Sequence, residues 1–151
     1  MFAETILEAA GGAEAVRATL TGWSVESGTV IVADGSGLSR HNLVTPDALV
    51  TVLTRMHRDE RLRDRFEAAL PVAGRDGTLA DRMIGTPAAG NARAKTGSFS
   101  NARGLSGYVR TADGELLVFA ILANNFGTTP DTIEDAADAI VVKLAEFKRR
   151  R

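Results

Sequence analysis

The sequence contains no cysteine and only two histidines among its 151 residues. The absence of cysteine excludes disulfides, thiolate nucleophiles and cysteine-ligated metals, and two histidines are too few for a histidine-rich metal cluster. No apolar run approaches the ~20 residues that a transmembrane helix requires. The N-terminal stretch MFAETILEAAGG has no basic segment, so it does not fit a signal peptide. The sequence therefore predicts no metal, no cofactor, no membrane span and no export signal in this chain.

An excess of one charge is also missing, since 18 lysines and arginines balance 19 aspartates and glutamates. The net charge of −1 excludes the broad basic surface of a nucleic-acid-binding protein. The single basic run, residues 148–151, ends a predicted helix, where positive charge suits the helix dipole, and we expect it to be a solvated tail. With 44% apolar and 25% charged residues, the composition is that of an ordinary globular chain of one domain's length.

Apolar residues recur at helical spacing in several places. The predicted helices cover residues 1–10, 13–20, 46–56, 61–70 and a final segment after Thr129. Thr45 and Thr129 each precede a proline, which is typical of a helix N-terminus because threonine caps the first turn and proline fits the first helical position. In the final helix we expect one apolar stripe to face the core, and its members are Ile133, Ala136, Ala137, Ile140, Val141 and Leu144.

Other runs favour β-strands, at residues 29–33, 92–98, 104–111 and 115–124. The turn ADGE at residues 112–115 predicts a tight hairpin between the last two. The run LLVFAILA in the last strand is apolar without alternation, which indicates a central strand covered on both faces. We therefore predict an α+β fold in which an antiparallel sheet meander is flanked by helices, within a single domain.

The motif Lys-Thr-Gly-Ser at residues 95–98 carries the clearest chemistry in the sequence. On an edge strand, Lys95 and Gly97 face one side and Thr96 the other. Lysine supplies an ammonium, threonine a hydroxyl that can donate to a carboxylate, and free strand N–H groups can bind an extended peptide or an oxyanion. Acyl transfer on a peptide that ends in a carboxylate has these requirements, although so short a motif also recurs by chance. A phosphate-binding loop is excluded, because it needs glycine before the lysine and a helix after it.

Four longer stretches surround this motif, and together they cover most of the chain from Thr29 onward. They are ADGSGLSRHNLVTP (33–46), LPVAGRDGTLADRM (70–83), ARAKTGSFSNARGLSGYV (92–109) and LANNF (122–126). In these stretches the chain resembles the penicillin-binding serine peptidases, and closely the D-alanyl-D-alanine carboxypeptidase/endopeptidase family (S13) of the DacB, or penicillin-binding protein 4, type. The resemblance implies a penicillin-binding/β-lactamase-like transpeptidase fold.

That family uses three active-site elements: S-x-x-K with the acylated serine and its lysine base, S-D-N for proton transfer and substrate contact, and K-T-G. This chain contains K-T-G but neither S-x-x-K nor S-x-N. In relatives a stretch resembling MFAETIL directly follows S-D-N. We therefore expect this chain to be a C-terminal part of the catalytic domain that is inactive alone, or a reading frame begun at an internal methionine. The resemblance implies a parent protein that acts outside the cytoplasm, in the periplasm or cell envelope.

The resemblance also implies roles for individual residues. Lys95 would orient the proton network beside the serine and is the catalytic candidate, and Thr96 would bind the terminal carboxylate of the substrate. Gly97 would leave space for the substrate backbone. The N–H of Ser98 would form half of an oxyanion hole. Phe99 would flank the acyl donor.

Arg40, within DGSGLSR, is expected to face the cleft and meet a carboxylate of the peptidoglycan stem peptide, since a guanidinium suits bidentate recognition. Leu38 is expected to line the same pocket. Simpler interpretations exist for other polar residues in the matching stretches. Residues 34–37 are typical turn residues, and Arg82 and Asp76 could form an ion pair within their own loop.

The sequence thus predicts part of a serine-type D-Ala-D-Ala carboxypeptidase. Its partners would be a peptidoglycan stem peptide or a β-lactam, together with the missing N-terminal part of the same polypeptide. The alternative is a module without catalysis that binds peptidoglycan or peptide, or that complements another chain. A class A β-lactamase fits DGSGLSR and its neighbours less well. Without neighbouring strands, LLVFAILA would form an exposed apolar edge, so we also expect the isolated chain to self-associate.

Overall fold

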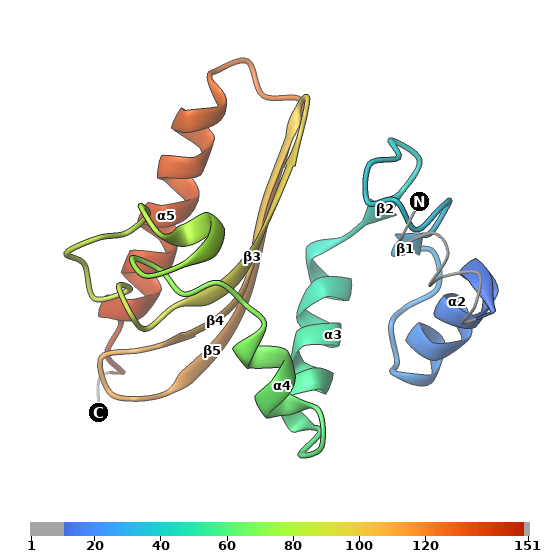
Figure 1. Ribbon diagram of the computed structural model, residues 1–151, viewed down its shortest axis with the longest axis horizontal. Helices are drawn as coiled ribbons and strands as arrows, with labels where there is room; N and C mark the ends of the chain where they lie inside the picture. The colour runs from blue at the N-terminus through green and yellow to red at the C-terminus, as the bar shows by residue number, and fades with distance from the viewer. Residues whose placement is uncertain (1–10, 150–151) are drawn as a thin grey trace. The chain divides into compact units, whose positions relative to one another are not determined.

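The computed structural model describes residues 11–149. It divides into two compact units, Met1–Arg55 and Met56–Arg151, and each is described by itself (Figure 1). The helix expected at residues 1–10 lies outside the described residues. Within residues 11–149, no helix combines the length and the apolar character needed to cross a membrane.

The first unit contains helix α2 (Gly12–Gly22), as its apolar spacing predicts, and a short antiparallel pair of strands, β1 (Val30–Ile31) and β2 (Leu43–Val44). The strand predicted at residues 29–33 is thus only two residues long. It ends early because the side chain of Asn42, and not another strand, accepts the N–H of Ala33 at 2.7 Å. A side-chain acceptor of this kind stabilises a turn in place of a strand ladder.

The threonine caps are confirmed at both predicted helix starts. Helix α3 (Pro46–Arg58) begins where Oγ1 of Thr45 accepts the N–H of Ala48 at 3.2 Å. At the start of the last helix, Oγ1 of Thr129 accepts the N–H of Thr132 at 3.3 Å. Each bond satisfies one of the backbone donors that a helix N-terminus leaves unpaired.

The second unit is the predicted meander with its helices (Figure 1). Its elements are α4 (Arg63–Ala68), the 3-10 turn η1 (Gly77–Leu79), β3 (Arg93–Phe99), β4 (Ala102–Arg110), β5 (Leu116–Asn124) and α5 (Pro130–Glu146). The three strands run antiparallel in the order β3-β4-β5, and α5 lies across one face of the sheet. Within the described residues β5 pairs only with β4, so it lies at an edge of this sheet and not at its centre.

The core lies between this sheet and α5, and its largest fully buried side chains are Leu79, Leu105, Val109 and Val141. The apolar stripe predicted for α5 is only partly correct. Ala137 and Val141 are buried, whereas Ile140 is 48% exposed. The face of α5 that points to the sheet differs from the predicted one because it includes two acidic side chains that form ion pairs. Glu134 pairs with Arg103 of β4, and Asp138 pairs with Arg82 of the loop before β3.

Strand alternation distributes the residues of β3 between two faces of the sheet. Thr96 is paired with Leu105, a core residue under α5, so Thr96 lies on the α5 face. Lys95 and Gly97 lie on the opposite face. The predicted alternation of the K-T-G motif is therefore the one observed.

Candidate active-site wall

The candidate site is residues 95–98 of β3, which we call the K-T-G segment. Lys95 is exposed on the face of the sheet away from α5, and its Nζ donates to the carbonyl oxygen of Thr96 at 2.6 Å. The ammonium is therefore not buried against the last helix. It lies along the open edge of β3, where it can meet a ligand that approaches that edge.

The backbone of the K-T-G segment faces outward at alternate residues. The N–H of Ala94 points away from β4, since it donates to the carbonyl oxygen of Pro71 at 3.0 Å. In an antiparallel sheet this orientation repeats every second residue, so the backbone groups of Thr96 and Ser98 also face outward. The segment around Pro71 covers only the beginning of β3, where Val72 forms an isolated bridge with Arg93. Thr96 and Ser98 thus present the N–H groups that strand addition or an oxyanion hole requires.

Gly97 is not required by packing within the described chain. A Cβ atom at this position would meet nothing closer than Gly104, at 3.9 Å, which is an ordinary contact. Gly107, in the neighbouring strand, differs sharply, because its Cβ would lie 2.0 Å from the carbonyl oxygen of Arg93. A glycine inside a strand lowers stability unless something must come close to it. Among the described residues, β3 approaches Gly107 this closely, whereas no backbone or side chain approaches Gly97 in the same way.

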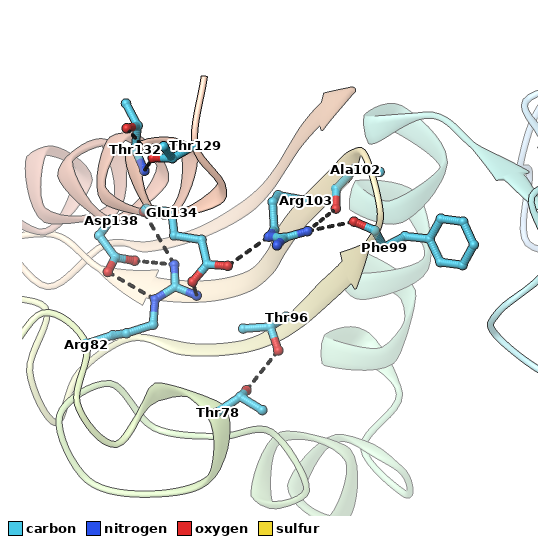
Figure 2. Close-up of polar contacts among 10 residues, drawn as sticks. All are labelled: Thr78, Arg82, Thr96, Phe99, Ala102, Arg103, Thr129, Thr132, Glu134 and Asp138. Carbon is cyan, nitrogen blue, oxygen red and sulfur yellow. Dashed lines mark hydrogen bonds and ion pairs between the residues drawn. The ribbon is translucent and has the colours of Figure 1, made fainter. Parts of the chain in front are cut away.

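Thr96 is fixed from the side by another loop. Its hydroxyl donates to Oγ1 of Thr78 over 2.9 Å, and Thr78 lies on η1 (Figure 2). The candidate carboxylate-binding hydroxyl therefore already has a hydrogen-bond partner in this structure.

Arg103 holds the hairpin that follows the K-T-G segment. Its Nη1 donates to the carbonyl oxygens of Phe99 at 2.7 Å and Ala102 at 2.9 Å, while its Nε donates to Glu134 of α5 at 2.9 Å (Figure 2). The side chain is only 19% exposed. Arg103 thereby connects the β3–β4 turn to the helix beneath it, and the aromatic ring of Phe99 points away from this cluster.

Arg82 makes a second, partly buried link to α5. It binds both carboxylate oxygens of Asp138, at 2.6 and 3.0 Å, and its Nη1 lies 3.8 Å from Glu134. The suggested pair between Arg82 and Asp76 is wrong, since the Asp76 carboxylate instead accepts the N–H of Val72 at 2.8 Å. Sequence proximity suggested the local pair, and only the fold brings Asp138 to Arg82.

A small cavity lies between the K-T-G segment and α5. Its lining residues include Thr96, Ser98, Arg103, Ile121 and Glu134. Its volume is ≈ 20 Å³, which is room for about one water molecule. A peptide cannot enter it, so a ligand of this strand would bind along the outer edge.

The DGSGLSR loop belongs to the first unit and is ordered by its own side chains. The Asp34 carboxylate accepts hydrogen bonds from the hydroxyl of Ser36 at 2.7 Å, from its N–H at 3.0 Å and from the Asn42 amide at 3.1 Å. The Ser36 hydroxyl and N–H hold the pKa of Asp34 below its usual range. Residues 34–37 thus form a structured turn. Leu38 is 68% exposed, and Arg40 is exposed as well.

One cluster of packed side chains was not predicted from the sequence. On the face of the sheet away from α5, the Tyr108 ring is 2% exposed and lies 5.8 Å, centroid to centroid, from the ring of His57. Nδ1 of His57 is 2.6 Å from the Glu67 carboxylate. Burial, with a smaller contribution from Glu67, raises the pKa of Tyr108 to about 12. A single tyrosine in the sequence does not predict this packing.

Comparison with known proteins identifies a matching family and several relatives. The sequence profile of the D-Ala-D-Ala carboxypeptidase 3 (S13) family matches residues 5–147. A D-alanyl-D-alanine carboxypeptidase from Actinomadura sp. (strain R39) is 40% identical over 141 residues, which are 90% of this chain and 26% of that protein. The chain therefore spans about a quarter of this relative's length.

Two solved structures are similar in fold. Penicillin binding protein 4 (dacB) from Haemophilus influenzae, determined in complex with a β-lactam, matches with a TM-score of 0.79 and 31% identity, over 89% of this chain and 33% of that one. The TLA-1 extended-spectrum β-lactamase matches with a TM-score of 0.71 at 17% identity, over 95% of this chain and 59% of that one, which shows the fold alone. The predicted α+β, β-lactamase-like fold is confirmed. On the profile match and these relatives, the chain belongs to the D-Ala-D-Ala carboxypeptidase 3 (S13) family.

Proposed function

We propose that this chain forms the substrate-binding wall of a serine-type D-Ala-D-Ala carboxypeptidase that acts on peptidoglycan stem peptides through an acyl-enzyme. The observation that carries the proposal is the open edge of β3. There an exposed ammonium, a threonine hydroxyl and the outward backbone groups of Thr96 and Ser98 occur within residues 95–98. Such a cationic strand edge suits an extended peptide that ends in a carboxylate.

The proposed chemistry assigns each group one task. A serine supplied by another segment attacks the carbonyl carbon of the penultimate D-alanine, and the N–H of Ser98 donates to the oxygen that becomes negative. The C–N bond then breaks, the terminal D-alanine leaves with a proton on its nitrogen, and water later hydrolyses the serine ester. Lys95 orients the proton network beside the serine, while Thr96 donates to the terminal carboxylate.

The glycine of the motif supports this assignment. A Cβ at Gly97 would make only ordinary contacts, with Gly104 at 3.9 Å, and glycine in a regular strand lowers stability. A ligand backbone lying against the strand would explain the missing side chain. Phe99 would flank the same ligand, and Arg40 with Leu38 would contact the stem peptide.

The nucleophile and its base must come from elsewhere, because S-x-x-K and S-x-N do not occur in the 151 residues. We therefore expect the isolated chain to be inactive and its essential partner to be the segment that carries those elements. Since the proposed substrate is peptidoglycan, we place the parent activity outside the cytoplasm.

A fusion protein tests the proposal. The portion of the Actinomadura carboxypeptidase that lies outside its match to this chain is joined to this chain, and labelling by a fluorescent penicillin and release of D-alanine are measured. We expect the fusion to be labelled and active, the isolated chain to be unlabelled, and Lys95→Ala in the fusion to lose activity. Labelling of the isolated chain, or a folded fusion that takes no label, would refute the proposal.

The alternative is a binding or chain-complementing module without catalysis. It is favoured by one observation, namely that the strand keeps its carboxylate-binding groups without a nucleophile motif in the same chain. Calorimetric titration of the isolated chain with a D-Ala-D-Ala peptide separates the two. Heat that Lys95→Ala abolishes would favour the module, whereas no heat from the isolated chain would favour a wall that needs its partner.

A further inference from the structure

Thr78, outside the K-T-G motif, forms a hydrogen bond with the hydroxyl of Thr96. The two Oγ1 atoms are 2.9 Å apart, with Thr96 as donor, and Thr78 is exposed (Figure 2). Thr78 reaches β3 from η1, 18 residues earlier in the chain. The contact therefore joins two elements, and it occurs at the group to which the proposed function assigns the carboxylate.

The turn that carries Thr78 is rigidly held. Leu79, the next residue, has no exposed surface, and its carbonyl oxygen accepts the N–H of Gly74 at 2.9 Å. On the other side, Gly77 has a φ of +53°, and a Cβ there would lie 3.0 Å from the ring of Pro71. The backbone of the turn is therefore anchored at Leu79, next to Thr78, and this places the Thr78 side chain beside Thr96.

A hydroxyl group has one proton to donate and can accept through its lone pairs. In this structure Thr96 directs its proton to Thr78. A carboxylate that binds Thr96 must receive that proton, so the hydrogen bond between the two threonines is kept only if it reverses, with Thr78 becoming the donor. Only a side chain that both accepts and donates can keep Thr96 in place in both states.

We propose that Thr78 is a positioning residue for the Thr96 hydroxyl, and that through this reversible hydrogen bond it favours ligands that end in a carboxylate. The inference rests on the proposed function for its ligand class. The hydrogen bond itself rests only on the structure.

The first test uses the full chain and needs no ligand. NMR three-bond couplings from the Thr96 methyl carbon to its backbone nitrogen and carbonyl carbon report the χ1 rotamer. We expect a single rotamer in the wild type, averaged rotamers in Thr78→Val, which has the same shape without the hydroxyl, and a single rotamer again in Thr78→Ser. Thr128→Val, at an exposed threonine in the loop before α5, serves as control. An unchanged Thr96 rotamer in Thr78→Val would overturn the inference.

The second test uses the fusion protein described above. Peptides ending in D-Ala-D-Ala, as free carboxylate or as C-terminal amide, compete with fluorescent penicillin for labelling. Thr78→Val should weaken the carboxylate peptide by about tenfold, the size expected for one hydrogen bond, and weaken the amide peptide less, because a hydrogen bond to a neutral carbonyl is weaker than one to a carboxylate. KM should rise with kcat unaltered, because Thr96 contacts the carboxylate before and during the reaction.

The outcomes separate the two proposals. If the wild-type fusion folds but neither labels nor cleaves, the proposed function fails, and the rotamer measurement alone decides the hydrogen-bond role of Thr78. If the wild-type fusion is active and Thr78→Val weakens both peptides equally, or Thr78→Ser does not restore the preference, the role of Thr78 in carboxylate recognition is wrong while the proposed function stands.

Discussion

At the scale of single residues, two glycines on neighbouring strands serve opposite purposes. Gly107 exists for the fold, because a Cβ there would overlap the backbone of β3 at Arg93 and Ala94. Gly97 has open space beside it and no unusual backbone angle. The same residue type thus marks a packing constraint in one strand, whereas in the other it has no packing role among the described residues and lies where we propose that a ligand binds.

Alanine substitution should distinguish them. We expect Gly107→Ala to destabilise the chain by about 1–3 kcal/mol or more, as overpacking does, and Gly97→Ala to raise the free energy of unfolding by about 0.5–1 kcal/mol, because alanine suits a strand better than glycine does. Urea unfolding measures both. In the fusion protein Gly97→Ala should nevertheless reduce penicillin labelling, and a Gly97→Ala variant with wild-type labelling would argue against a ligand at that position.

Tyr108 offers a test of packing through its ionisation. Its pKa is raised to about 12, so the neutral ring is favoured in the folded state relative to an ordinary pKa of about 10. The associated stability is fully present below pH ~10 and is lost as the pH rises from ~10 toward ~12. Because the chain has one tyrosine, absorbance of its phenolate follows this residue alone. We expect phenolate to appear only as near-ultraviolet circular dichroism is lost, and a folded protein that ionises near pH 10 would contradict this.

At the scale of elements, α5 is fastened to the sheet by ion pairs as well as by apolar packing. Arg82 and Asp138 are 16% and 17% exposed, and their contact is bidentate. Removing one partner of a fully buried pair typically costs about 3–5 kcal/mol. The cost is smaller here, because the pair is only partly buried and Arg82 keeps Glu134 at 3.8 Å.

We therefore expect Asp138→Ala to destabilise the chain by about 1–3 kcal/mol, measured by urea unfolding. The double variant Arg82→Met/Asp138→Leu should lose less, because it leaves no isolated charge in the interior. Lys143→Met provides a control, since Lys143 is 79% exposed and pairs with Glu146 at the surface. Equal losses in the single and double variants would show that packing volume, and not charge, dominates at this site.

Local patterns in the sequence predicted the elements more reliably than their orientation. Threonine caps, a glycine turn and short-range periodicity depend on neighbours in the sequence, and the helices and strands of the second unit appear within a few residues of their predicted limits. The outward turn of Ile140 and the link from Arg82 to Asp138 depend on residues 56 positions apart, which no local pattern encodes. For the candidate site, the alternation of Lys95 and Thr96 was predictable, whereas Thr78 and Arg103 became visible only in three dimensions.

At the scale of the whole molecule, the sheet ends at β5. The strand pattern that turns the backbone of Thr96 outward at one edge also turns the backbone groups of Val118, Ala120 and Leu122 outward at the other. An apolar strand with open hydrogen-bonding groups is a template for another strand. The long apolar run predicted as a central strand therefore has a free side in the described part of the chain.

We expect the isolated chain to self-associate through β5, with an apparent mass in light scattering that rises with concentration. Ala120→Pro should reduce this association, because it removes an outward N–H without breaking a bond to β4. Ala120→Thr keeps the N–H and serves as control. A wild-type chain that stays monomeric at high concentration, with well-dispersed NMR signals, would contradict the prediction.

The carbonyl oxygen of Pro71 has a further consequence. By taking the N–H of Ala94, it closes one end of the open edge of β3, so that within this strand only Thr96 and Ser98 still have backbone groups that face outward without a partner strand. One of their carbonyl oxygens, that of Thr96, already receives the Lys95 ammonium. The open edge of β3 is therefore short and closed at one end. A peptide of any length can form only a few backbone hydrogen bonds with it. Affinity of the isolated chain for such peptides should accordingly depend little on their length.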